Sequence, residues 1–200
     1  MSMTRRVPQL VLGLWLFGAS VGLMVQADLG LPSWDVLHQG LAQVTGIPMG
    51  YVVIIISAVV MLLWIPLRQR PGVGTLANMI GVGLALEATL VFLPAPEHLA
   101  WRITFLIAGV ILNGVGTGLY IGAGFGPGPR DGLMTGLAKK GRSIRMVRLS
   151  IELVVLAIGW LLGGTVWIGT LAYALAIGPL AHVFIPMFSG TKTDGAAPTT

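Results

Sequence analysis

Two stretches of the chain resemble each other, and the rest of the sequence is arranged around them. Residues 27–42 read ADLGLPSWDVLHQGLA, and residues 123–138 read AGFGPGPRDGLMTGLA. A constant shift of 96 residues (123 minus 27) aligns the first alanines, the aspartates Asp35 and Asp131, and the closing Gly-Leu-Ala. The segments before them also match at this shift, with glycines at three shared places. The chain is therefore predicted to contain two copies of one unit.

The composition indicates an integral membrane protein made of helices. Hydrophobic residues make up 55% of the 200 residues, charged residues only 10%, and the mean hydropathy is +0.88. A soluble domain usually carries about 25% charged residues. The chain contains no cysteine, which excludes disulfides, a thiolate metal site and a cysteine nucleophile. The net charge of +5 does not indicate nucleic-acid binding, because the basic residues lie where membrane topology places them.

The apolar runs predict six spanning helices, each close to the roughly 20 residues that a bilayer requires. They cover residues 10–26, 51–67, 74–93, 101–122, 146–162 and 166–188. The basic start and first apolar run are typical of a secretory signal, but a removable peptide has no reason to match an internal helix. The predicted organisation is a cytoplasmic N-terminus, two three-helix repeats and a disordered cytoplasmic tail, at residues 1–9, 10–95, 101–188 and 189–200.

Each copy of the repeated stretch is predicted to form a short helix that does not span the membrane. In the first copy, Pro32 favours a break and the helix covers residues 34–43, which is too short to cross. The helix is either re-entrant or interfacial. In the preceding span Gly18 and Gly22 are four residues apart, as are their counterparts, and this spacing allows a neighbouring helix to approach closely. The alternative is that the spacing arises by chance, because the chain contains 29 glycines.

The charge distribution predicts the topology. If the N-terminus is cytoplasmic, 11 of the 12 Lys and Arg residues lie inside and only Arg102 lies outside. Both termini are then cytoplasmic in a bacterial plasma membrane. Because each repeat has three spans, the two copies have opposite orientations, an arrangement that recurs in transporters.

The strongest candidates for a substrate site lie at the start of the short helices. They are Asp35 and Asp131, together with Arg130 and its repeat counterpart Trp34. The two aspartates are equally explained as stabilising the first turn of a helix. Arg130 suits a carboxylate or phosphate, or else an anionic lipid head group.

Four further residues are candidates for coupling or gating. Glu87 and His182 are repeat counterparts at a shift of 95 residues, and both types titrate when buried. The alternative is that each lies near a membrane surface and is simply hydrated. Arg148 and Glu152 are four residues apart, so they share a helical face, where an anchoring ion pair is the alternative to a site role.

The sequence lacks the motifs of common enzymes, so we expect no enzyme activity and no cofactor. It contains no GxSxG, HExxH, P-loop or paired-cysteine pattern, and its three histidines lack the spacing of metal ligands. The expected partners are the lipid bilayer, a small-molecule substrate, a cytoplasmic protein and a second copy of the chain, but not nucleic acid.

Two separated motifs are similar to signatures of the bacterial YczE membrane proteins and, more loosely, the YitT group. They are LGLPSWDVLHQG at residues 29–40 and GPRDGLM at residues 128–134. The pairs of glycines and the IGTL and IGPL segments between residues 163 and 180 also fit. The resemblance covers nearly the whole chain. It implies a multi-pass bacterial plasma-membrane protein, without implying a substrate or catalytic residues.

The leading hypothesis is a small secondary transporter or exporter with its site between the two short helices. A second hypothesis is an accessory or regulatory membrane protein that docks a cytoplasmic partner through the segment from Lys139 to Arg148. A third is the ligand-capturing subunit of an ATP-driven importer.

Overall fold

The computed structural model describes residues 3–139, 141 and 143–189, and the regular structure within them is helical. The predicted tail beyond Ser189 lies outside the described residues, as do Lys140 and Arg142 of the predicted docking segment. The described helices are α1 (Met3–Ala27), α2 (Ser33–Thr45), α3 (Met49–Leu62), α4 (Val73–Phe92), α5 (Leu99–Gly122), α6 (Pro129–Ala138), α7 (Ile144–Leu161) and α8 (Ile168–Ser189).

Four of these helices, α1, α4, α5 and α8, are long and apolar enough to cross a membrane. A fifth crossing results if α2 and α3 count as one span, although the pair is bent by 114°. The helix α3 has only 14 residues, and the 18 residues of α7 include three charged side chains. The protein is thus all-helical with four or five candidate spans in its described residues, and the count of six remains a prediction.

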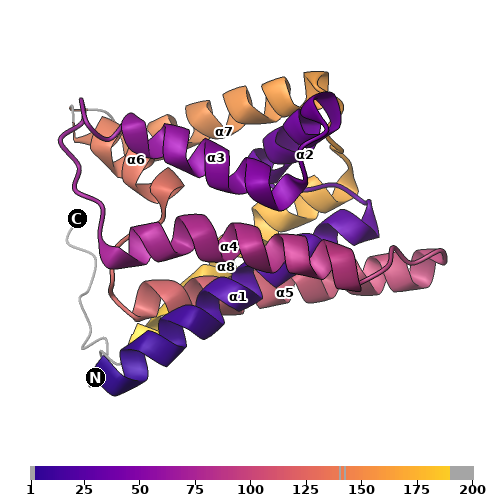
Figure 1. Ribbon diagram of the computed structural model, residues 1–200, viewed down its shortest axis with the longest axis horizontal. Helices are drawn as coiled ribbons and strands as arrows, with labels where there is room; N and C mark the ends of the chain where they lie inside the picture. The colour runs from indigo at the N-terminus through magenta and orange to yellow at the C-terminus, as the bar shows by residue number, and fades with distance from the viewer. Residues whose placement is uncertain (1–2, 140, 142, 190–200) are drawn as a thin grey trace.

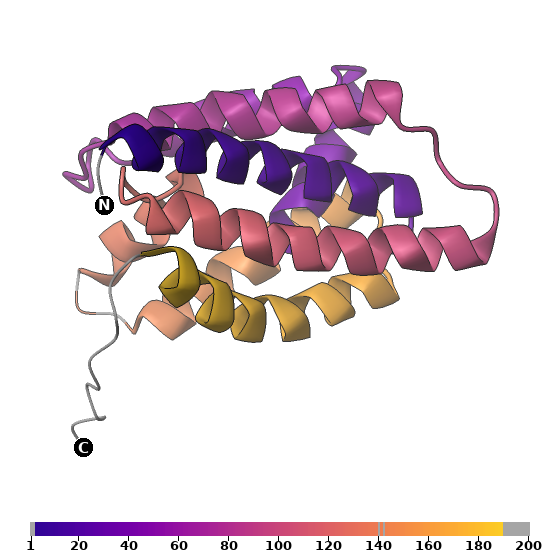
Figure 2. The same ribbon diagram turned by 90° about the horizontal axis from the view of Figure 1, so that it is seen from below.

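The helices form two layers (Figures 1 and 2). One layer holds α1, α4, α5 and α8, with α1 packed on both α5 and α4, and α8 packed on α5. The other layer holds the short helices α2 and α6 together with α3 and α7. In this second layer α7 packs against α2 and α6, and α3 also packs against both short helices.

Glycines allow the close packing in the first layer, as their spacing predicts. A side chain added at Gly18 of α1 would overlap Ala85 of α4, and one at Gly114 of α5 would overlap Leu180 of α8. The same holds one turn further along, where Gly22 faces Thr89 and Gly118 faces Phe184. The two contacts between helices are therefore built from repeat counterparts.

Hydrogen bonds also recur between counterparts. Gly74 donates its N–H to the carbonyl of Phe125 at 3.0 Å. Gly169 donates in the same way to the carbonyl of Leu29 at 2.7 Å, which is the same contact with the two halves exchanged. In each case the first turn of one half's last long helix is fixed to the loop before the other half's short helix.

Arg6 and Arg102, 96 residues apart, make a second exchanged pair of contacts. Arg6 donates from Nε to the carbonyl of Ala123 at 2.7 Å, and Arg102 donates from Nε to the carbonyl of Ala27 at 2.7 Å. These carbonyls belong to the C-terminal ends of α5 and α1, where no backbone partner remains within the helix. Arg102 also pairs with Asp28 at 2.9 Å. The one basic residue predicted to lie outside therefore stabilises a helix end.

One contact in the first half has no equivalent in the second. The helices α3 and α4 pack tightly, because a side chain at Gly50 or Gly83 would overlap the other's backbone carbonyl. The N–H of Gly50 also donates to Glu87 Oε2 at 2.9 Å. In the second half, no atom of the described residues outside its own helix backbone lies within 4 Å of where a side chain on Gly178, the counterpart of Gly83, would begin. The structure is closed between α3 and α4 and open between α7 and α8.

Candidate functional site

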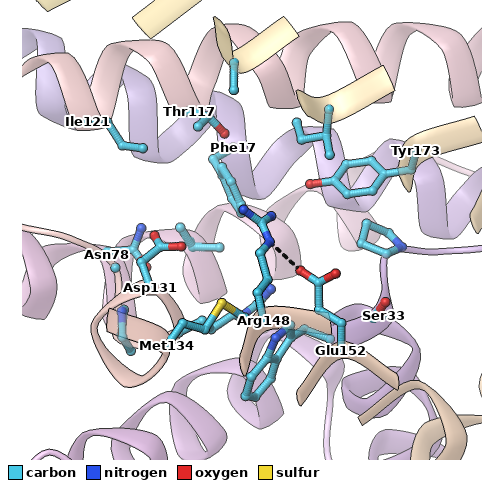
Figure 3. A pocket seen from close by; sticks show the side chains of 18 of the residues that line it. Phe17, Ser33, Asn78, Thr117, Ile121, Asp131, Met134, Arg148, Glu152 and Tyr173 are labelled. Carbon is cyan, nitrogen blue, oxygen red and sulfur yellow. Dashed lines mark hydrogen bonds and ion pairs between the residues drawn. The ribbon is translucent and has the colours of Figure 1, made fainter. Parts of the chain in front are cut away.

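A cavity of about 410 Å³ lies between the two layers. Its volume falls within the range of sites for small molecules, about 300–1,000 Å³. Residues from both repeats line it, and the view in Figure 3 looks into it. Its aromatic lining residues are Phe17, Trp34, Tyr120 and Tyr173, and its charged ones are Arg130, Asp131, Arg148 and Glu152.

Both short helices begin at this cavity. Pro32 precedes α2, and Pro129 occupies the first position of α6, where a missing N–H costs nothing and the fixed φ suits a helix. The N-terminal residues of each helix line the cavity. A helix N-terminus carries a partial positive charge, so the carboxylates of Asp35 and Asp131 in the first turns are electrostatically favourable.

The first charged cluster joins the two short helices. Asp35 is 2% exposed, and its Oδ1 accepts from Arg130 Nη2 at 3.3 Å and contacts His38 Nδ1 at 3.1 Å. The guanidinium of Arg130 also lies over the Trp34 ring, 5.4 Å from its centre. A buried carboxylate needs such partners, because an uncompensated charge in a low-dielectric interior is costly. The cluster brings together three of the four predicted substrate-site residues.

His38 belongs to this cluster and was missed by sequence reasoning. It is fully buried, and its Nε2 has no hydrogen-bond partner among the residues that the structure describes. A signal was present, because His38 follows Asp35 by three residues and such neighbours meet on one helical face. Metal-ligand spacing among the three histidines is a different pattern, and it gives no sign of this pair.

The second cluster surrounds Asp131, on the wall formed by α4, α5 and α6. The hydroxyl of Tyr120 donates to Asp131 Oδ2 at 2.9 Å, and the Tyr120 ring packs edge-on against Phe17. The start of α6 is held in place by Trp64, whose Nε1 donates to the carbonyl of Pro129 at 3.0 Å. Asp131 therefore has a fixed position at the cavity.

The chain matches the model of a known protein family over most of its length. Residues 4–186 match the family of unknown function DUF6198. The chain belongs to this family.

Three relatives of this DUF6198 protein extend the comparison. An uncharacterized protein of Haemophilus influenzae is 42% identical over 88% of this chain and 81% of its own length. The uncharacterized membrane protein YczE of Bacillus subtilis is 34% identical over 85% of this chain and 80% of its own. The uncharacterized protein YyaS of the same organism is 27% identical over 88% and 90%. The resemblance to the YczE proteins is thus confirmed, and no solved structure matches the chain.

Two of the residues predicted for coupling or gating also reach the cavity of this DUF6198 protein. Arg148 Nε donates to Glu152 Oε1 at 2.9 Å, which is the pairing that the spacing of four residues predicts (Figure 3). Both line the cavity from α7, and residues of α8 also line it. Because Arg148 is more than half exposed, the pair adds little to stability. Its position suits contact with a bound molecule.

The other two candidates lie elsewhere. Glu87 is half-buried between α4 and α3, where it accepts from the Gly50 N–H, and it does not line the cavity. His182 is exposed on α8 and does not line the cavity either. Repeat equivalence therefore does not place these two side chains in equivalent surroundings, because α4 packs on α3 whereas the described part of α8 does not pack on α7 in the same way.

A hydrogen-bonded chain of polar side chains leads away from the cavity. Tyr173 lines the cavity and donates its hydroxyl to Asn113 Oδ1 at 2.9 Å. Asn113 donates in turn to Ser20 Oγ at 2.8 Å, deep between α1 and α5. The cavity thus offers aromatic faces, hydroxyl groups and charges of both signs, a set that fits a small polar or charged organic molecule.

Proposed function

We propose that this DUF6198 protein is a small secondary transporter whose substrate binds in the central cavity. One observation carries the proposal: the ion pair of Asp35 and Arg130 joins the first turns of the two short helices at the wall of a cavity of about 410 Å³. Transporter sites are often formed where discontinuous helices from two repeats meet. The role proposed is transport rather than catalysis.

The architecture that we propose is two inverted repeats with six membrane crossings. In support, contacts between α1 and α4 recur between α5 and α8, and the bonds of Arg6 recur at Arg102. The short helices are then re-entrant, because both begin at the cavity rather than at an end of the bundle. Irregular backbone is tolerated at membrane depth where it is buried in protein or lines a cavity.

The difference between the two halves supports alternating access. The Gly50–Gly83 contact closes α3 against α4, while Gly178 faces open space between α7 and α8. In the proposed cycle the halves exchange these arrangements, so that the cavity opens on one side at a time. Both termini are proposed to be cytoplasmic in a bacterial plasma membrane.

The test begins with a ligand screen. A ligand that binds only the folded protein raises its apparent melting temperature, so a thermal-shift screen of small metabolites identifies binders. A radiolabelled binder is then followed into proteoliposomes. We expect Arg130→Gln and Asp131→Asn to abolish flux while Arg70→Gln, on an exposed connection outside the cavity, keeps it.

Two outcomes oppose the proposal: uptake that is unchanged in both cavity variants, or binders that produce no flux in the parent protein. Release of a co-purifying partner by Lys139→Glu would instead favour the accessory-protein alternative. Co-purification with an ATPase pair would favour the importer subunit.

A further inference from the structure

A small polar recess opens beside Gly128, at the start of α6. A side chain begun at Gly128 would lie 3.3 Å from Asp131 Oδ2, 3.5 Å from Asn78 Oδ1 and 3.5 Å from the Tyr120 hydroxyl. These oxygens come from three helices, α6, α4 and α5, and all four residues line the central cavity. Figure 3 shows Asn78 and Asp131 together on one wall.

The backbone does not require a glycine here. Gly128 has φ −65° and ψ 162°, an extended conformation that any residue adopts. The three atoms nearest to its missing side chain are all oxygens, with no carbon among them. The glycine therefore leaves a space surrounded by hydrogen-bond acceptors and a hydroxyl, rather than relieving strain or a close helix contact.

The chemistry of the three oxygens suits a hard cation. A carboxylate, an amide carbonyl and a hydroxyl are the ligand types that such ions prefer. Asp131 Oδ2 and the Tyr120 hydroxyl are 2.9 Å apart, so one ion at a bond length of about 2.4 Å can touch both. Only one carboxylate is present, and the described residues hold no cluster of three His, Cys, Asp or Glu side chains. One negative charge matches a monovalent ion.

Charge balance also favours an ion at this place. Asp35 has Arg130, and Glu152 has Arg148, as an ion-pair partner. Among the described residues, Asp131 has the Tyr120 hydroxyl as a partner but no ion pair. The N-terminus of α6 compensates only part of the Asp131 charge. A carboxylate within a membrane protein is costly unless it is paired, so a bound cation would compensate the rest.

We propose that Asp131, Asn78 and Tyr120 bind a sodium ion in the recess beside Gly128. The role of this ion as the coupling ion rests on the proposed transport function, whereas its binding does not. Because Asp131 follows Arg130 directly at the start of α6, sodium and substrate would bind to adjacent groups. Because coupling is reciprocal, a sodium ion that raises the affinity for the substrate has its own affinity raised by the substrate by the same factor.

The experiment measures the melting temperature of the purified full chain in sodium chloride and in choline chloride of equal ionic strength. We expect a saturable rise with sodium and none with choline. Asp131→Asn keeps the shape but removes the charge, and Gly128→Ala fills the recess, so both are expected to abolish the rise. Asp28→Asn is the matched control, because Asp28 pairs with Arg102 outside the cavity and asparagine tolerates its φ of 49°.

Equal shifts in both salts, or a sodium shift that persists in Asp131→Asn, would overturn the site. If Gly128→Ala does not fold, Asp131→Asn decides the question, with direct binding of radioactive sodium as the second measurement. The two proposals fail separately. Sodium binding without flux would remove the transporter and keep the site. Flux that does not depend on sodium would remove the coupling role, whereas the absence of a sodium shift in the parent protein would remove the site and leave transport untouched.

Discussion

Arg130 Nη2 lies 3.3 Å from Asp35 Oδ1, and this ion pair connects the two short helices through residues that are 95 positions apart in the chain. The two side chains of the pair differ in exposure to solvent: that of Asp35 is only 3% exposed, whereas that of Arg130 is 21% exposed. Loss of the arginine leaves a buried carboxylate, while loss of the aspartate leaves a cation that reaches the cavity.

The first prediction concerns this inequality. Arg130→Gln should lower the free energy of unfolding by about 3 kcal/mol, the scale found when one partner of a buried pair is removed. Asp35→Asn should cost less, and the double variant should be more stable than Arg130→Gln alone. Unfolding of the protein in mixed micelles measures all three. Additive effects of the single changes would show that the two residues do not interact.

The second prediction compares two repeat counterparts, Gly83 and Gly178. Gly83→Ala forces a methyl group onto the Gly50 carbonyl and the Ile54 side chain, so it should destabilise by about 1–3 kcal/mol, as overpacking does. Gly178→Ala meets no atom within 4 Å and should change stability by less than about 0.5 kcal/mol. Thermal unfolding of the two variants measures the difference. Equal costs would contradict the observed opening between α7 and α8.

The third prediction tests the exchange of the two halves. Ile54 contacts the site of a Gly83 side chain, and the counterparts of these residues are Ser150 and Gly178. Because the chain has no cysteine, Ser150→Cys and Gly178→Cys together create a unique pair. We expect oxidation to form a disulfide only when the second half closes, and the cross-linked protein to lose flux. Gel mobility before and after reduction reports the cross-link.

A protein that never forms this disulfide under oxidant, yet transports normally, would contradict alternating closure of α7 on α8. The single Gly178→Cys variant is the control, because it tolerates the added side chain without a partner.

The fourth prediction concerns topology. Glu97 lies in the exposed connection between α4 and α5, and Arg70 lies in the exposed connection between α3 and α4. Glu97→Cys should react with a membrane-impermeant maleimide in intact cells, whereas Arg70→Cys should react only after permeabilisation. The opposite labelling pattern would reverse the orientation predicted from the positive charges.

The sequence predicted the approximate helix positions and singled out the four charged residues that line the cavity, because both leave local signals. Proline and aspartate mark the start of α2, and glycines four residues apart mark the contact between α1 and α4. The repeat alignment also pointed to Asp35, Arg130 and Asp131. The same alignment was a poor guide for Glu87 and His182, because two aligned positions keep their environments only if their neighbours also match.

The open side of the cavity was not predictable from the sequence. Gly83 and Gly178 align, and nothing in their own segments indicates that one is covered and the other is not. That difference depends on where α7 lies relative to α8, which is a tertiary property. His38, which contacts Asp35 in the cluster of Asp35, Arg130 and Trp34, shows the converse case. Its spacing of three residues from Asp35 is a local signal that predicts their contact on one helical face.

The paired contacts of Arg6 and Arg102 have a consequence for biosynthesis. During translation the C-terminal end of α1 emerges 75 residues before Arg102, the side chain that bonds to its last carbonyls. Arg6, in contrast, is synthesised early, and its bond to the carbonyl of Ala123 forms only after α5 has been made. Until residue 102 has been made, the last carbonyl of α1 must accept hydrogen bonds from water or other groups, so the first half gains this contact only when the second half begins to emerge.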